Sequence, residues 1–264
     1  LMRAGTLRDE EQKGLAFQKA CSCNSLKELR DIPEAMVLAY MAQSRMNCVF
    51  CIDNYYLLEE PSAAIIHGRH HDVEIMAGSC ANEGAAFGYG YRNTIDGFRG
   101  AVASFFPGVE EIAWKLYDIR SDKEAAGSDA DVMADGAVFG THYWAKVHNK
   151  LGRKPLYVYY FCQKLPDREG NPSEEGSFHS GDLWYIHGTL NRSWRAFREA
   201  DYRLSDLEMR YFTNFAKNAN PNGGNLPEWT PFTPEEPCTM LLCDSPRMDA
   251  MEKNVGMMTV LQAE

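Results

Sequence analysis

Two short apolar runs constrain the fold more than any other feature of the sequence. Residues 73–78 read V-E-I-M-A-G, and residues 156–161 read L-Y-V-Y-Y-F. Runs of this length with few polar residues are typical of strands that are buried on both faces. Pro155 suits the start of the second strand, where its missing N–H removes no ladder hydrogen bond. A third run at 239–243 predicts another short strand, so strands far apart in the chain are expected to share one sheet.

Helical patterns fill the sequence between these strands. Residues 94–126 are acidic and are interrupted at Pro107, and a further helix is predicted over 129–151. Strands that alternate with helices favour an α/β protein with a mostly parallel central sheet flanked by helices. We expect residues 1–264 to form a single portion of one domain. Within it, residues 94–151 are predicted to be a helical cap or flanking segment rather than a crossover between strands.

Two capping boxes predict where helices begin. Ser25 is followed by Glu28, and Ser205 is followed by Glu208, at the spacing in which the two side chains satisfy free N–H groups at a helix start. The second predicted helix continues to Lys217 along an apolar face and stops at the sequence N-A-N-P-N-G-G. We therefore expect a long amphipathic helix that begins at residue 205.

The composition excludes several classes of partner. The chain of 264 residues is 45% hydrophobic and 24% charged, as in ordinary globular proteins. Its net charge of −10 repels phosphate groups, and its basic residues are scattered, so no nucleic-acid partner is expected. The apolar runs are far shorter than the roughly 18–20 residues of a membrane span, which predicts no membrane partner.

Eight cysteines are present, several in apolar surroundings where a thiol packs as a small hydrophobic group. This usage, with no visible signal peptide, favours a cytoplasmic location, although the native N-terminus can lie upstream of Leu1. The pairs Cys21/Cys23 and Cys48/Cys51 fit no common zinc module, so no metal is predicted, and a zinc-binding domain is the weakest alternative. An oxidised pair stays open, because spacing alone does not give the geometry.

Four sequence blocks, in this order, carry a resemblance to a known family. They are D-V-E-I-M-A-G-S-C-A-N-E-G at 72–84, G-S-F-H-S-G-D-L-W-Y-I-H-G at 176–188, Y-F-T-N-F-A-K-N-A-N-P-N at 211–222, and L-P-E-W-T-P-F at 226–232. Together they resemble the type-B carboxylesterase and cholinesterase family of the α/β-hydrolase superfamily, and within it the para-nitrobenzyl esterases. The resemblance implies the C-terminal portion of an α/β-hydrolase fold.

The resemblance implies roles for two side chains. Glu83, in the loop after the first strand and with its carboxylate expected to be exposed, corresponds to the acid of a catalytic triad, and His179 corresponds to its base. His187 is the rival histidine, at a position where the family usually has Phe, and it is expected to pack. Asn82 and Asp182 stand where the family has Asp and Glu. Asp182 is expected to hold a hydrogen bond near the histidine loop, with a surface carboxylate as the alternative.

Three aromatic residues near these loops, Phe87, Trp184 and Tyr185, are candidates for the walls of a substrate pocket. Packing in the core is an equally open interpretation for each of them. An ester needs apolar walls for its acyl or alcohol part, so the assignment depends on whether these rings face the catalytic loops.

The nucleophile of the triad is missing. No serine has Gly at both the second preceding and the second following position, and no H-G-G-G-type oxyanion loop is present. Because the superfamily orders its triad as serine, acid and histidine, we expect the nucleophile in an N-terminal half upstream of Leu1. The chain alone is then expected to be inactive.

These observations favour a serine esterase fragment that acts on small-molecule carboxylic esters without a cofactor and has the N-terminal half of the same protein as its partner. The alternative is a non-catalytic, cholinesterase-like binding module. Self-association through an exposed sheet edge is a further expectation.

Overall fold

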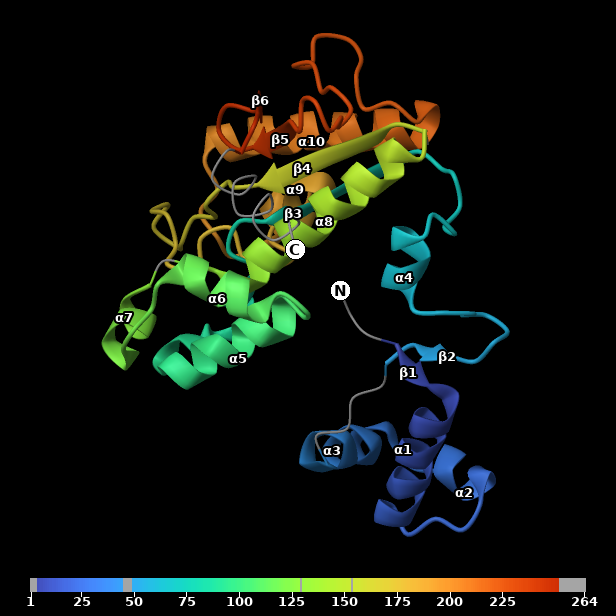
Figure 1. Ribbon diagram of the computed structural model, residues 1–264. Helices are drawn as coiled ribbons and strands as arrows, with labels where there is room; N and C mark the ends of the chain where they lie inside the picture. The colour runs from blue at the N-terminus through green and yellow to red at the C-terminus, as the bar shows by residue number, and fades with distance from the viewer. Residues whose placement is uncertain (1–3, 45–48, 129, 153, 252–264) are drawn as a thin grey trace. The chain divides into compact units, whose positions relative to one another are not determined.

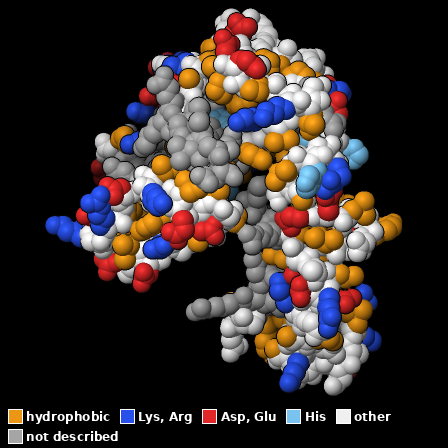
Figure 2. Space-filling model, in the orientation of Figure 1, with side chains coloured by type: hydrophobic (Ala, Val, Ile, Leu, Met, Phe, Trp, Pro, Cys, Tyr) orange, Lys and Arg blue, Asp and Glu red, His pale blue; other side chains and the backbone are white. Residues whose placement is uncertain are grey.

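The computed structural model describes residues 4–44, 49–128, 130–152 and 154–251. The chain divides into two compact units, Leu1–His70 and His71–Glu264. Basic and acidic side chains are interspersed over the face shown in Figure 2. No helix among the described residues is long and apolar enough to cross a membrane.

The first unit is mainly helical. Its elements are β1 (Gly5–Thr6), α1 (Leu7–Ala20), α2 (Leu26–Arg30), α3 (Glu34–Ser44), β2 (Cys51–Ile52) and α4 (Pro61–Ile66), and β1 pairs with β2 in parallel. The predicted start of α2 is confirmed: the Glu28 N–H donates to Ser25 Oγ over 3.2 Å. The Glu28 carboxylate accepts from the N–H of Asn24, one residue before the cap.

A four-stranded sheet organises the second unit (Figure 1). Its strands lie side by side in chain order: β3 (Ile75–Cys80), β4 (Leu156–Phe161), β5 (Thr239–Leu242) and β6 (Arg247–Asp249). β3, β4 and β5 are parallel, and β6 is antiparallel to β5. The predicted mostly parallel sheet is thus confirmed, with the first strand shifted two residues towards the C-terminus.

The two faces of β4 pack against different helices. Tyr157 and Phe161 contribute to a core shared with α9 (Leu183–Ile186) and α10 (Glu199–Asn218). Leu156 and Val158 point to the other face, where they pack with Ala145 of α8 (Val132–Lys150). Figure 1 shows α8 and α10 on opposite sides of the sheet. Burial on both faces explains why this strand is apolar along its whole length.

The segment between β3 and β4 combines a small helical core of its own with a crossover helix, α8 (Val132–Lys150). Two short 3₁₀ turns, Glu83–Phe87 and Gly90–Asn93, are followed by α5 (Ile95–Phe105), α6 (Glu110–Tyr117) and α7 (Asp122–Gly127). These helices form their own core around Phe98, Val102 and Phe106. α8 then packs on the sheet and returns the chain to β4 beside β3. The small helical core precedes the crossover helix, which is why the pattern alone suggested a flanking segment.

The start of α10 also differs from the prediction. The helix begins at Glu199, and its capping box is formed by Arg198 and Asp201 rather than by Ser205 and Glu208. The Arg198 N–H donates to Asp201 Oδ2 over 2.8 Å. Ser205 lies inside the helix and donates its hydroxyl to the carbonyl of Tyr185 over 2.8 Å. Tertiary contacts of Asp201 and Ser205 therefore decide where the helix starts.

Trp229 lies at the centre of the core beneath α10. Its ring meets those of Tyr157, Tyr159 and Tyr211 edge to face, at centroid distances of 6.1, 6.4 and 5.2 Å. The Asn222 side chain holds both backbone groups of Trp229, accepting from its N–H and donating to its carbonyl. The indole N–H has no hydrogen-bond partner among the described residues.

Substitution of Trp229 tests this packing. We expect Trp229→Ala to lower the free energy of unfolding by about 3–5 kcal/mol, because a large cavity replaces the ring. Trp229→Phe should cost less, because it also removes a buried N–H without a partner. Trp194→Ala, at a ring that is 56% exposed, is the control and should cost about 1 kcal/mol or less. Urea unfolding monitored by circular dichroism measures all three; equal losses for the two Trp229 variants would contradict the assignment.

Candidate active site

Glu83 lies three residues after the end of β3, at the start of the first 3₁₀ turn. Its side chain is buried, which corrects the expectation of an exposed carboxylate. Oε1 accepts the N–H of Cys80 over 2.7 Å, and Oε2 lies 2.5 Å from Nδ1 of His179. Both oxygens therefore have partners, as a buried carboxylate requires. The structure brings together the two residues that the sequence resemblance pairs.

Backbone pairing holds the two loops in register. The Asn82 N–H donates to the Ser177 carbonyl over 2.9 Å, and the Ser177 N–H donates to Asn82 Oδ1 over 3.0 Å. Asn82 and Phe178 form an isolated parallel bridge beyond the ends of β3 and β4. The amide of Asn82 supplies the acceptor oxygen, so the departure from the family's Asp leaves this contact intact. Pairing one residue before Glu83 and one before His179 sets both side chains.

Asp131 joins the loop that carries Glu83 to α8. It is the N-cap of that helix, and its Oδ1 accepts the Ala134 N–H over 3.0 Å. Its other oxygen, Oδ2, accepts the Gly84 N–H over 2.8 Å. The side chain is buried, so both bonds form away from bulk water. The residue next to Glu83 is thereby fixed to a helix that packs on the sheet.

His179 presents one ring nitrogen to the outside. Its side chain is 49% exposed, and Nε2 has no hydrogen-bond partner among the described residues. The carboxylate at Nδ1 favours the tautomer with the proton on that nitrogen, which leaves the Nε2 lone pair available. Phe87, 64% exposed, places its ring 5.6 Å from the imidazole. The arrangement can take a proton at Nε2 from a group brought to this exposed edge.

Arg195 packs against the loop that carries His179, a role that the sequence did not predict. Its guanidinium donates to the Pro166 carbonyl and to Glu175, and its Cζ lies 5.0 Å from the ring centroid of Phe178. The side chain is only 5% exposed, so the contacts with the ring are well desolvated. A lone arginine in a sequence gives no signal for this role, because its partners come from other segments.

The three predicted pocket residues have different environments. Phe87 lies beside His179, as described above. Trp184 packs edge to face on Phe178 at 5.9 Å, on the side of the loop that Arg195 occupies. Tyr185 is completely buried and donates its hydroxyl to Asp201 over 2.8 Å. Of the two interpretations left open for Tyr185, the structure therefore favours packing in the core.

Asp182 is buried, which excludes the surface alternative. Its carboxylate takes hydrogen bonds from Cys80 and from the Tyr159 hydroxyl, the latter at 3.4 Å, and burial raises its pKa. Glu208 of α10 lies close enough for the charge of Asp182 to act on it. Glu208 is fully buried, and both of its oxygens lack a hydrogen-bond partner among the described residues. Burial, and then the charge of Asp182, raise the pKa of Glu208 well above its usual value.

Other histidines that could act as a base or as metal ligands lie in different environments. His142 is buried under the sheet with Nε2 2.8 Å from Thr239 Oγ1, and burial lowers its pKa to about 4. His187 caps the end of α9. Within the described ranges, no group of three or more His, Cys, Asp or Glu side chains is arranged to hold a metal ion. Cys48 lies outside the described residues.

The fold and the site together define the class of protein. A mostly parallel sheet lies between helices, and the loops that follow two neighbouring parallel strands carry a paired carboxylate and imidazole. In open α/β sheets, sites form at the carboxyl ends of the strands. This arrangement is an α/β-hydrolase fold with a helical subdomain.

The chain belongs to the carboxylesterase family, since the model of that family matches residues 9–257. Carboxylesterase 4A of Bos taurus is 32% identical over 108 residues, which is 40% of this chain and 19% of that protein. Cocaine esterase of Homo sapiens is 33% identical over 109 residues, again 40% of this chain and 19% of the relative. The matched part therefore spans about a fifth of the length of these relatives.

Solved structures share the fold. A thermophilic PNB esterase superposes with a TM-score of 0.75 and 19% sequence identity, over 98% of this chain and 55% of that chain. A second PNB esterase gives a TM-score of 0.73 at 20% identity over 97% of this chain. At this level of identity the likeness concerns the fold, and it agrees with the predicted superfamily.

Gly176 is expected to be essential for the pairing of the two loops. Its φ is +61°, and an added Cβ would lie 2.3 Å from Asn82 Oδ1. We expect Gly176→Ala to lower the free energy of unfolding by about 1–3 kcal/mol. Gly140 lies in the middle of α8 with open space around it, so Gly140→Ala should raise the free energy of unfolding by up to about 1 kcal/mol. Urea denaturation compares the two; a shift of the same sign for both would contradict the role assigned to Gly176.

Glu208 gives a prediction about pH. Its raised pKa means that the folded state binds more protons than the unfolded state, so the stability of the protein falls as the pH rises above the unfolded-state pKa of about 4.3. Glu208→Gln should therefore be more stable than the native chain at pH 7, by on the order of 1–3 kcal/mol. The difference should shrink towards pH 4. Glu199→Gln, at an exposed site on the same helix, should show no such trend, and a difference that grows in acid would contradict the account.

Proposed function

We propose that this chain supplies the acid, Glu83, and the base, His179, of a serine esterase whose nucleophile lies N-terminal to Leu1. The observation that carries the proposal is the 2.5 Å contact between Glu83 Oε2 and His179 Nδ1, with Nε2 of the same ring open. Nδ1 is the nitrogen that the acid of a triad holds, and Nε2 is the one that faces the serine.

In this proposal the reaction runs through an acyl-enzyme. His179 Nε2 takes the proton of the serine hydroxyl as the hydroxyl oxygen attacks the ester carbonyl. The same nitrogen returns the proton to the departing alcohol, and water then hydrolyses the acyl-serine in a second round. Glu83 holds the ring and stabilises the imidazolium that forms in each round. The donors for the oxyanion would come from the same segment as the serine.

Two further observations support a serine from outside the chain. No serine of the sequence has the G-x-S-x-G surroundings of a nucleophile elbow. β3 is also an edge strand of the sheet among the described residues, so its outer edge can pair with a strand of an N-terminal half. A second copy of the chain could use the same edge, which makes self-association of the isolated chain part of the proposal.

The substrate class is a small carboxylic ester. Membership of the carboxylesterase family supports it, as does a relative with the name cocaine esterase. The apolar ring of Phe87 beside His179 can contact the acyl or alcohol part of such an ester. No cofactor takes part in the proposed reaction.

The proposal is tested on a polypeptide that includes the coding sequence upstream of Leu1. A fluorophosphonate probe should label one serine in the upstream segment, and mass spectrometry of the labelled peptide locates it. With p-nitrophenyl butyrate, His179→Gln should lower kcat by roughly 10³–10⁵-fold, because the nucleophile loses its base. His187→Gln is the matched control and should change kcat by less than about threefold.

The same experiment defines the failure of the proposal. Labelling of a serine within the 264-residue chain would show that the nucleophile is not upstream. Rapid hydrolysis by the isolated chain that is abolished by His179→Gln would have the same meaning. Absence of both labelling and hydrolysis in the extended polypeptide would favour the non-catalytic binding module.

A further inference from the structure

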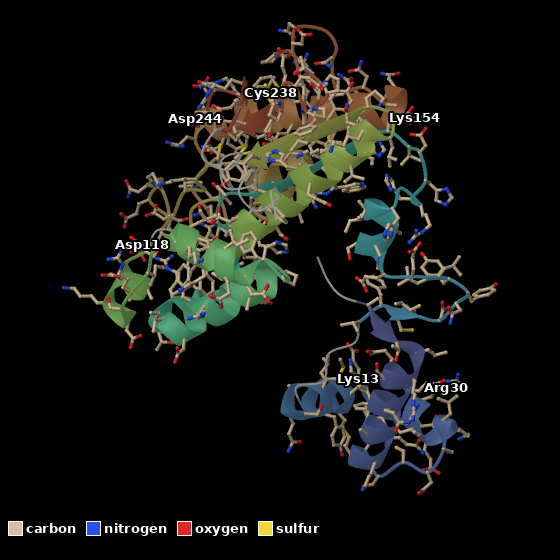
Figure 3. All side chains as sticks on the ribbon, in the orientation of Figure 1. Lys13, Arg30, Asp118, Lys154, Cys238 and Asp244 are labelled. Carbon is tan, nitrogen blue, oxygen red and sulfur yellow. The ribbon has the colours of Figure 1, made fainter. Side chains whose placement is uncertain are left out.

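Two cysteines end neighbouring parallel strands at the same level of the sheet. Cys162 follows β4, and Cys243 follows β5. The last registered pair of these strands is Phe161 with Leu242, so the two cysteines are the next pair along. The Cys162 N–H donates to the Leu242 carbonyl over 3.0 Å, which continues the ladder into this pair. Asp244, the residue after Cys243, is labelled in Figure 3 and shows where this pair lies in the fold.

The geometry of a parallel ladder suits a bond between these side chains. Neighbouring strands lie about 4.8 Å apart, which falls within the range of about 4.4–6.8 Å between the Cα atoms of a disulfide. Both side chains also point to the same face of the sheet, where they pack beside Val138, Leu241 and Tyr160. In the structure both cysteines are free, and the Cys243 thiol donates to the Ser245 carbonyl over 3.4 Å.

The two thiols differ in their surroundings. Nη1 of Arg247 donates to Cys243 Sγ over 3.6 Å, which places a positively charged group against that sulfur. The charge of Arg247 reaches Cys162 as well and lowers its pKa, but burial, and then the neighbouring Cys243 thiol, outweigh it and raise the pKa of Cys162 to about 12. Cys243 is therefore the thiol suited to attack first, and Cys162 the one suited to resolve the product.

We propose that Cys162 and Cys243 form a redox-active thiol pair that a small-molecule disulfide, such as glutathione disulfide, converts reversibly into an internal disulfide. The proposal is independent of the proposed esterase activity. The internal disulfide would link the carboxyl ends of β4 and β5, at the start of the segment that leads from β4 to His179.

The chemistry balances in two exchange steps. The Cys243 thiolate attacks one sulfur of glutathione disulfide, which forms a mixed disulfide and releases one glutathione thiolate. The Cys162 thiolate then attacks Cys243 Sγ, which forms the internal disulfide and releases the second glutathione. The protein loses two electrons and two thiol protons, and the glutathione disulfide becomes two glutathione thiols. The second step should accelerate with rising pH, because only the thiolate of Cys162 attacks.

The test uses the reduced chain with native Cys and a glutathione disulfide buffer. After the remaining thiols are blocked, chymotrypsin can cut at Leu241 or Leu242, which separates Cys238 from Cys243. Mass spectrometry should find a peptide pair joined through Cys162 and Cys243 as the main cross-link, and dithiothreitol should remove it. The oxidised chain should melt about 5–10 °C higher than the reduced chain.

Variants make the assignment specific. Cys162→Ser should stop at a stable mixed disulfide on Cys243, and Cys243→Ser should give no cross-link to Cys162. Arg247→Gln should slow the first step several-fold at neutral pH. Cys21→Ser, in the first unit, is the matched control and should leave the cross-link unchanged. The proposal is overturned if the native chain accumulates only the mixed disulfide, or if Cys162 remains fully open to alkylation after oxidation.

Discussion

The hydrogen bond between Glu83 and His179 is the interaction that the rest of the site depends on. A carboxylate at a buried position is costly unless its oxygens are satisfied, and an imidazole held at one nitrogen has its other nitrogen oriented as well. Glu83 meets the first condition through Cys80 and His179. The second condition sets Nε2 towards the open side of the loop. One contact thus accounts for the burial of Glu83 and for the orientation of the His179 ring.

Contacts of further residues hold the loops that carry Glu83 and His179 in place. Asn82 and Ser177 extend the pairing of β3 and β4 into the two loops. Asp131 ties the acid loop to α8 on one face of the sheet, while Arg195 packs the histidine loop against aromatic rings. The site contains several buried acids, and one of them, Glu208, lacks partners among the described residues. Such a group lowers stability, so its presence is a cost that other packing has to offset.

The strands and the paired residues could be predicted because their signals are local. Residues 156–161 are apolar on both faces, and the blocks around Glu83 and His179 are contiguous in the sequence. The start of α10 could not be predicted, since Asp201 caps the helix with help from Tyr185 and Gln163, which are distant in the chain. The role of Arg195 could not be predicted either, because its partners Pro166 and Glu175 come from another segment. The burial of Glu208 was missed, and that of Tyr185 was left open, because a helical pattern does not tell how deep its polar positions lie.

The central claim is that Glu83 and His179 form a hydrogen-bonded pair through Nδ1, with Nε2 on the open side of the loop. Nitrogen-15 NMR of the histidine-labelled chain, with the resonance of His179 assigned by His179→Gln, tests it most directly. The account predicts the tautomer with the proton on Nδ1 and a strongly downfield proton that Glu83→Ala abolishes. A proton on Nε2, or a signal for His179 that Glu83→Ala leaves unchanged, would contradict it.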